Sequence, residues 1–208
     1  MRKRLLTSLA IAFGTITWLP ATSAHAANQR TIADVLLSDT AKDDADGFDQ
    51  RWWDFDIVTQ AVLLFPDIAA AAGDADANLT VFAPTDSAFR ALVQDLTGQR
   101  LDSEADVFAA VAGLGTATVE AVLTYHVVPD AISYGAAARA VASGPAALPT
   151  LNGATLTAES TGGWWRLIRL VDQEPDLRDP IVVFPNVRGK LANGYIHGID
   201  RVLLPVDL

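Results

Sequence analysis

The chain has 208 residues, a formal net charge of −10 and no cysteine. An acidic surface repels phosphate backbones and anionic lipid headgroups, so nucleic acid and bare membrane are excluded as favoured partners. Without cysteine the fold contains no disulfide and no cysteine nucleophile, so its stability must come from an apolar core.

The first 26 residues have the pattern of a secretory signal peptide. Basic residues 2–4 precede an apolar run, Leu5–Leu19, that is too short to span a bilayer comfortably, and Ala24–Ala26 resembles a cleavage site. We therefore expect a secreted or periplasmic protein with no membrane insertion, and no lipid anchor because no cysteine follows. Residues 27–208, with a core over about 31–206, are then one domain with 12 basic and 25 acidic side chains, a formal charge of −13.

A helix is predicted at Thr31–Leu37, and an acidic segment follows it. Asp39–Asp56 holds seven aspartates around Trp52-Trp53. This composition is too polar for a core element, so we interpret the segment as a surface insertion. A second helix is predicted from the end of this segment and is broken near Pro66.

The stretch from Leu79 to Phe89 is predicted to be a short strand that leads into a helix. Leu79–Ala83 is apolar, and Pro84-Thr85-Asp86 is typical of a helix start. The Asp86 carboxylate is expected to cap backbone N–H groups at that helix start, a contact that stabilises by about 0.5–2 kcal/mol. Two more helices are predicted to begin near residues 102–103 and 116–118, and the second leads into a strand-like Val127-Val128.

Strands dominate the prediction for the C-terminal part of the chain. Asn152-Gly153 lies between two alternating runs in Leu148–Ala158, which indicates a β-hairpin. Further strands are predicted at residues 166–171, 181–184, 195–199 and 201–204. Helices mainly in the first half and strands mainly in the second favour an α+β fold over an alternating parallel one.

Three motifs resemble those of one known family. Thr80–Phe89 (TVFAPTDSAF), Leu123–Pro129 (LTYHVVP) and Asn193–Pro205 (NGYIHGIDRVLLP) are similar, in order and separation, to the two conserved blocks and the intervening Tyr-His motif of the fasciclin (FAS1) domain. The residues that carry the resemblance are Thr80, Phe82, Pro84, Thr85, Asp86, Phe89, Tyr125, His126, Asn193, Gly194, His197 and Asp200.

The resemblance implies a FAS1-like fold, in which two small β-sheets form a wedge or sandwich with helices packed alongside. It also implies an extracellular adhesion or matrix-interaction domain without catalysis, whose partner is a protein or a polysaccharide. In animal members an Asp-Ile pair shortly before the second block is linked to integrin recognition. The corresponding segment here, Val187–Ala192, has no such aspartate, so integrin recognition is not carried over.

His126 and His197 are the two histidines of residues 27–208. In a structural reading each imidazole is buried and hydrogen-bonded and ties the helical half to the strand half, because an unpaired buried ring costs roughly 1–3 kcal/mol. A metal-dependent hydrolase that uses His126, His197 and Asp200 is a further hypothesis. The chain has no local pair of metal-ligating histidines and no nucleophile elbow, so we predict no metal site, no cofactor and no enzyme activity.

The acidic loops Asp44–Asp49 and Asp74–Asn78 are candidate calcium ligands by composition. Neither fits the EF-hand pattern, because Lys42 takes the first ligand position of one loop and the glycine is missing from the other. We interpret both as solvated loops.

The candidate binding residues are two adjacent tryptophan pairs, Trp52, Trp53, Trp164 and Trp165. Burial or mutual packing is one reading of these pairs, and an exposed aromatic patch for a glycan or a protein is the other. The alternative function is accordingly a binding module for a small apolar ligand or soluble glycan, held by the tryptophan-bearing loops.

Overall fold

The computed structural model describes residues 30–40, 47–162 and 167–206, with seven helices and seven strands in these ranges. The helices are α1 (Ile32–Thr40), α2 (Asp56–Leu63), α3 (Pro66–Gly73), α4 (Asp86–Thr97), α5 (Glu104–Ala112), α6 (Thr116–Tyr125) and α7 (Tyr134–Val141). The strands are β1 (Leu79–Pro84), β2 (Val127–Val128), β3 (Ala146–Pro149), β4 (Thr155–Ser160), β5 (Ile168–Val171), β6 (Val182–Phe184) and β7 (Gly194–Ile199). All the described helices precede β3, so the expected α+β class with helices first is confirmed.

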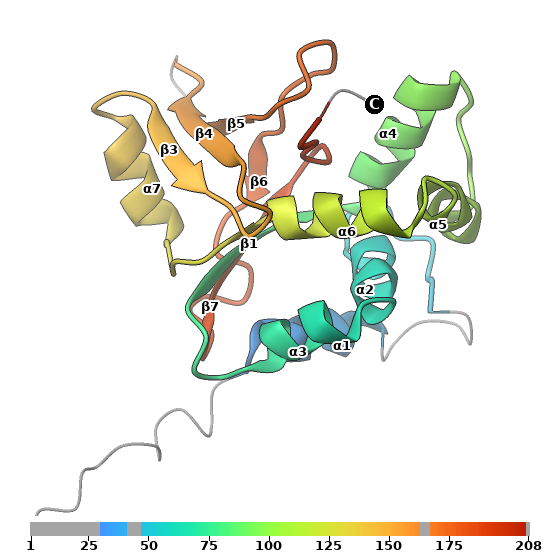
Figure 1. Ribbon diagram of the computed structural model, residues 1–208, viewed down its shortest axis with the longest axis horizontal. Helices are drawn as coiled ribbons and strands as arrows, with labels where there is room; N and C mark the ends of the chain where they lie inside the picture. Colours follow the sequence, from blue (N-terminus) through green and yellow to red (C-terminus); the bar gives the residue numbers. More distant parts are fainter. Residues whose placement is uncertain (1–29, 41–46, 163–166, 207–208) are drawn as a thin grey trace, which may run out of the picture.

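The strands form two small sheets, as expected. One has four strands in the order β2-β1-β7-β6, and the other is the antiparallel sheet β3-β4-β5. The sheets adjoin at an isolated bridge between Arg169 and Ile181. In Figure 1 the three-stranded sheet and α7 lie at the upper left, and α1, α2 and α3 lie at the bottom. The predicted hairpin around Asn152-Gly153 is confirmed by the β3–β4 pairing.

The first and last motifs pair with each other. Strand β1 runs parallel to β7, in a register that begins at Leu79 with Gly194 and ends at Pro84 with Ile199. Gly194 has φ of 137°, and a Cβ at this position would collide with the Leu79 carbonyl oxygen. Only glycine fits this close approach of two backbones.

Asn193 joins three elements to the start of β7. Its buried side-chain Oδ1 accepts from the Ile32 N–H at 2.9 Å, and its Nδ2 donates to the Ala72 carbonyl at 2.8 Å. Its own carbonyl accepts from the Leu79 N–H at 2.9 Å. Helix α1, helix α3 and strand β1 are therefore held together by one residue of the third motif.

The strand predicted at residues 201–204 is wrong. These residues form no strand, although Val202, Leu203 and Leu204 are all buried. The Leu203 N–H donates to His126 Nε2, and the Leu204 N–H donates to Asp172 Oδ2. Because side chains take the donors that a neighbouring strand would otherwise use, the segment packs in the core without joining a sheet.

The described part of the predicted surface insertion Asp39–Asp56, from Gly47 onward, combines exposed residues such as Arg51 and Trp53 with buried ones. The Phe48 ring is buried and lies 5.7 Å from the Phe108 ring, and Asp56 is fully buried at the start of α2. The polar composition is tolerated because the carboxylates of this segment are bonded within the fold rather than solvated.

In the described part of the chain, no single helix is long and apolar enough to cross a membrane, and only the bent pairs α2–α3 and α5–α6 reach that length and composition together.

Candidate functional site

The two tryptophans of the first pair have different environments. Trp52 is half-buried, and the Arg90 guanidinium lies 3.8 Å from its ring centroid. The Trp52 carbonyl also accepts from the Ser87 N–H at 2.8 Å. Trp53 is 67 % exposed. Trp52 thus anchors the loop to α4, in a cation–π contact, and Trp53 is presented to solvent. Trp164 and Trp165 lie outside the described residues.

Trp53 forms one side of an open groove, called here the Trp53 groove and lined by Trp53, Asp54, Phe55, Phe184, Pro185, Asn186, Val187 and Arg188. The groove has a volume of about 430 Å³. Phe184, opposite, is 42 % exposed. The second wall could not be predicted from the sequence, because Phe184 lies in a predicted strand and the following turn has no recognisable pattern.

The second wall is held in place by His197. The Asn186 N–H donates to His197 Nδ1 at 3.1 Å, and Asn186 Oδ1 accepts from the Tyr134 N–H at 2.9 Å. Asn186 and Arg188 both have positive φ, at 50° and 59°. A turn in this sparsely populated conformation persists only where its surroundings fix it.

Both histidines use both ring nitrogens on backbone groups. His126 Nδ1 bonds the Val122 carbonyl at 2.7 Å, while Nε2 accepts from the Leu203 N–H at 3.0 Å. His197 Nε2 bonds the Ile132 carbonyl at 2.9 Å, complementing its bond from Asn186. Each ring is therefore neutral, with one N–H donor and one acceptor. Burial lowers the pKa of His126 to about 4 and lowers that of His197 as well.

The three residues of the hydrolase hypothesis have separate partners. Asp200 Oδ1 accepts from the Ile181 N–H at 2.7 Å, and its other oxygen pairs with Arg178. The ring nitrogens of the two histidines are all bonded to backbone groups, so neither ring faces Asp200. Among the described residues, the side-chain groups that could hold a metal contain carboxylates and no histidine.

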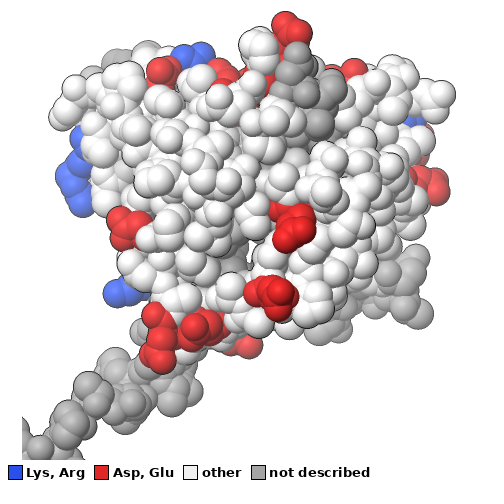
Figure 2. Space-filling view, in the orientation of Figure 1, with Lys and Arg blue, Asp and Glu red and all other residues white. Residues whose placement is uncertain are grey.

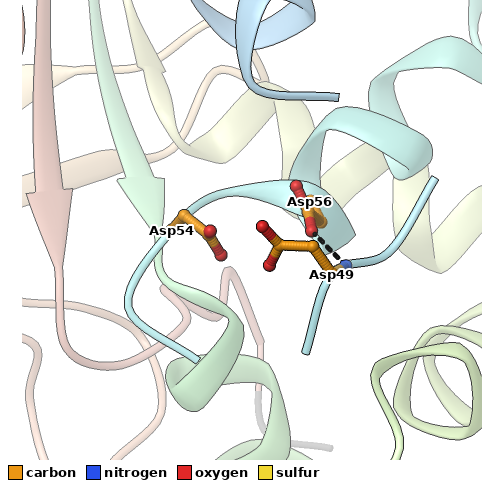
Figure 3. A group of neighbouring side chains, drawn as sticks. All are labelled: Asp49, Asp54 and Asp56. Atoms are coloured by element: carbon orange, nitrogen blue, oxygen red, sulfur yellow. Dashed lines mark hydrogen bonds between the residues drawn. The ribbon is translucent and has the colours of Figure 1, made fainter. Parts of the chain in front are cut away.

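Asp54, which lines the Trp53 groove, belongs to a cluster of carboxylates. We call Asp49, Asp54, Asp56, Asp86 and Glu104 the carboxylate cluster. Figure 3 shows the side chains of Asp49, Asp54 and Asp56 converging, with the Asp56 carboxylate accepting from the Asp49 N–H at 3.2 Å. Asp54 also belongs to a second group with Asp86 and Glu104, and within each group the oxygens lie within 4.8 Å of one another.

The pKa of one member of the cluster, Asp86, is strongly shifted. Burial, and then a hydrogen bond to the Asp54 side chain, raise the pKa of Asp86 well above its usual range. Asp86 is fully buried, so its charged form would lose its hydration beside other negative charges. A raised pKa favours the protonated form of Asp86, whose hydroxyl can donate to the Asp54 carboxylate in the loop that carries Trp53.

The predicted capping role of Asp86 is corrected by the structure. The Asp86 carboxylate accepts from the Ile57 N–H at 2.8 Å and from the Asp56 N–H at 3.3 Å. It thus bonds the first N–H groups of α2, whereas the cap of its own helix is Thr85, which makes no side-chain capping bond. Sequence spacing locates a helix start, but the direction of the side chain depends on the neighbouring helix.

The remaining motif residues lie in the core or tie loops to it. Thr80 Oγ1 donates to the Asp130 carbonyl at 2.6 Å and accepts from the Ile132 N–H at 2.8 Å. Phe82, Phe89 and Tyr125 are buried, and the Tyr125 hydroxyl bonds the Thr155 carbonyl at 3.4 Å. The motifs thus build the scaffold, and the groove lies at its edge.

Two motif-bearing strands in parallel, flanked by helices and carrying an aromatic surface groove, define a compact α+β domain. The model of the fasciclin domain family matches residues 56–205, so the chain belongs to that family, which is associated with cell adhesion. The match begins at the first residue of α2, and Trp53 lies just before it. The chain is also similar to a solved FAS1 domain pair from the insect cell adhesion molecule fasciclin I, with 20 % identity and a TM-score of 0.47. That alignment covers 69 % of this chain and 43 % of the insect chain, so this chain spans less than half the length of that relative. None of the curated proteins compared gives a match.

Proposed function

We propose that this protein is a secreted or periplasmic, non-catalytic adhesion module that contacts an extracellular protein or polysaccharide through the Trp53 groove. The observation that carries the proposal is the exposure of Trp53, 67 %, opposite Phe184 in an open groove. Aromatic side chains of this kind supply large contact area and dominate interface energetics.

Both walls of the groove are fixed before any partner binds. Trp52 is stacked under Arg90, and Asp54 of the same loop is joined to the buried Asp86. On the other wall Asn186 is bonded to His197 and Tyr134. Pre-organised contact residues lose little conformational entropy on association, which favours affinity.

Charges beside the groove favour a polar partner surface. Arg188 and Asp54 line it together with the aromatic rings. Rim charges of opposite sign guide orientation more than they add affinity. A polysaccharide face, with apolar C–H groups and hydroxyls, and a mixed polar protein surface both fit this lining.

The test is adhesion of beads coated with the purified protein to immobilised polysaccharides and extracellular matrix proteins. Trp53→Ala is expected to reduce retention at least tenfold, the effect of losing an interface anchor. Leu64→Ala is the matched control, because Leu64 is an exposed apolar residue, 56 %, that does not line the groove. Equal retention of the parent and Trp53→Ala beads would contradict the proposal.

The alternative, a soluble glycan held by the tryptophan loop, uses the same surface. Titration of tryptophan fluorescence with oligosaccharides separates the two functions. Saturable quenching by a short glycan, lost in Trp53→Ala, would favour the glycan binder. A flat response together with bead retention supports adhesion.

A further inference from the structure

A second hollow lies away from the Trp53 groove, between helices α1, α2, α3 and α6 and strand β1. Its volume is about 370 Å³, within the usual range of small-molecule sites. Close-packed protein interiors contain few voids larger than a water molecule, and an apolar cavity of roughly 150 Å³ already accepts benzene. We call the space between these helices and β1 the α3–α6 cavity. A space of this size requires an explanation other than imperfect packing.

The interior of the α3–α6 cavity is almost entirely carbon. Its walls include Ile32, Val58, Ile68, Phe82, Leu123 and Val127. His126 also lines it, but both of its ring nitrogens are bonded to backbone groups. The Thr124 hydroxyl donates to the Glu120 and Ala121 carbonyls. The interior therefore suits an apolar group and offers it few polar contacts.

The mouth of the cavity is acidic. Asp67 on α3 and Glu120 on α6 line the cavity, and both are exposed. Among the residues that the structure describes, no lysine or arginine lines the cavity or pairs with either carboxylate. Figure 2 shows acidic side chains beside a hollow on this face of the molecule. The charge at the mouth is therefore available to a cation.

We propose that the α3–α6 cavity binds a small amphiphilic cation, with its apolar body inside the cavity and its positively charged head between Asp67 and Glu120. The carbon-lined interior removes the apolar body from water. The carboxylates attract the cationic head and discriminate against an anion of the same size. The tryptophan loop takes no part in this site, because neither Trp52 nor Trp53 lines the cavity.

The experiment uses two fluorescent probes of similar size and opposite charge, the 9-aminoacridinium cation and the anthracene-9-carboxylate anion, which share a three-ring skeleton. The cation is expected to bind the parent protein saturably, with one site and a dissociation constant at least tenfold below that of the anion. Asp67→Asn combined with Glu120→Gln should reduce this preference to less than threefold. Equal binding of both probes by the parent would overturn the cationic assignment.

The location is tested by two substitutions on the same helix. Ala71 lines the cavity and is exposed, so Ala71→Trp should block the mouth and abolish cation binding. Ala70 is also exposed but does not line the cavity, so Ala70→Trp should bind the probe like the parent. Cation binding that survives in Ala71→Trp would place the site elsewhere. If Ala71→Trp loses its circular dichroism signal, Val62→Phe fills the cavity from α2 instead.

Two further measurements distinguish cation binding from occupation of the cavity by a second copy and from adhesion through the Trp53 groove. Self-association of the parent that Ala71→Trp abolishes, without cation binding, would show a second copy seated in the cavity and overturn the proposal. Trp53→Ala should leave cation binding unchanged, because Trp53 does not line the cavity. Loss of adhesion and loss of cation binding are therefore independent results.

Discussion

His197 Nδ1 accepts the backbone N–H of Asn186 at 3.1 Å, so a buried histidine of β7 fixes the turn that forms one wall of the Trp53 groove. The same ring bonds the Ile132 carbonyl and lies parallel to the Tyr195 ring, with 6.3 Å between the two ring centroids. Stability of the domain and the shape of its exposed groove therefore depend on one side chain.

Replacement of His197 tests this link. His197→Leu removes both hydrogen bonds and should lower the free energy of unfolding by about 1–3 kcal/mol, because it leaves buried backbone groups unpaired. Urea unfolding measures the loss, and hydrogen exchange should show faster exchange at Asn186 and Val187. Tyr195→Phe keeps the ring stack and serves as the control. Unchanged exchange at Asn186 in His197→Leu would show that the turn is fixed by other contacts.

The buried state of His126 predicts a loss of stability in acid. Its pKa falls from 6.5 to about 4 on folding. Between these values the unfolded chain binds a proton that the folded chain does not, so the free energy of unfolding decreases as pH falls, by up to about 3 kcal/mol from this group. Urea unfolding of the parent and of His126→Gln at pH 7 and pH 4.5 measures the effect. The parent's advantage should shrink at the lower pH, and a constant difference would exclude the mechanism.

Asp86 predicts the opposite pH dependence. Its pKa is raised on folding, so the folded chain holds a proton that the unfolded chain has lost above about pH 4. Its contribution to the free energy of unfolding is therefore greatest in acid and decreases as pH rises. Asp86→Asn cannot ionise and keeps an oxygen for the Ile57 N–H, so its stability relative to the parent should increase from pH 5 to pH 8 in thermal melts.

Asp86→Leu provides the contrast for this prediction. Neither variant ionises at this position, but leucine cannot accept from the Ile57 N–H or the Asp56 N–H, so Asp86→Leu should unfold more easily than Asp86→Asn by about 1–3 kcal/mol at every pH. If the stability of Asp86→Asn relative to the parent does not change between pH 5 and pH 8, the folded chain does not retain a proton on Asp86.

The close approach of two backbones at Gly194 predicts a large loss of folding stability when a single methyl group is added there. A Cβ at Gly194 would meet the Leu79 carbonyl oxygen, where β1 and β7 begin to pair. Gly194→Ala should therefore cost more than about 3 kcal/mol, at the diagnostic end of the range for point substitutions. Gly153 also has a positive φ, 90°, but open space around it, so Gly153→Ala should cost only about 1–2 kcal/mol. Similar thermal melts for the two variants would contradict this reading.

The scaffold could be predicted from the sequence because its elements have local signatures. The motif from Thr80 to Phe89 and the one beginning at Asn193 became β1, α4 and β7, and Asn152-Gly153 formed a hairpin. The helix at Tyr134–Val141 was not predicted. Tyr134, Ala137, Ala138 and Val141 do recur at helical spacing and pack in the second core, but alanine lies on both faces, so the pattern is hard to see in the sequence. Its start is nevertheless capped by Ser133, which accepts from the Ala136 N–H at 3.3 Å.

The candidate sites depend on contacts between distant segments and could not be predicted in the same way. Asp86 bonds helix α2 because α2 approaches the end of β1, a relationship that spacing along the chain does not contain. Glu104 of α5 belongs to the carboxylate cluster and also accepts from the Gln50 N–H at 2.8 Å, a residue 54 positions away. The α3–α6 cavity is likewise bounded by six elements whose apolar residues are each typical of a core.

The hydrogen bond from the Ile32 N–H to the Asn193 side chain joins positions 161 residues apart. Strand β1 pairs in parallel with β7, which belongs to the same third motif as Asn193. During synthesis β1 therefore has no parallel neighbour until residues 194–199 have left the ribosome. Pairing between segments so far apart forms late in folding, because the long loop must close before its contacts can stabilise it. A partly synthesised chain that lacks β7 is accordingly expected to lack a complete four-stranded sheet.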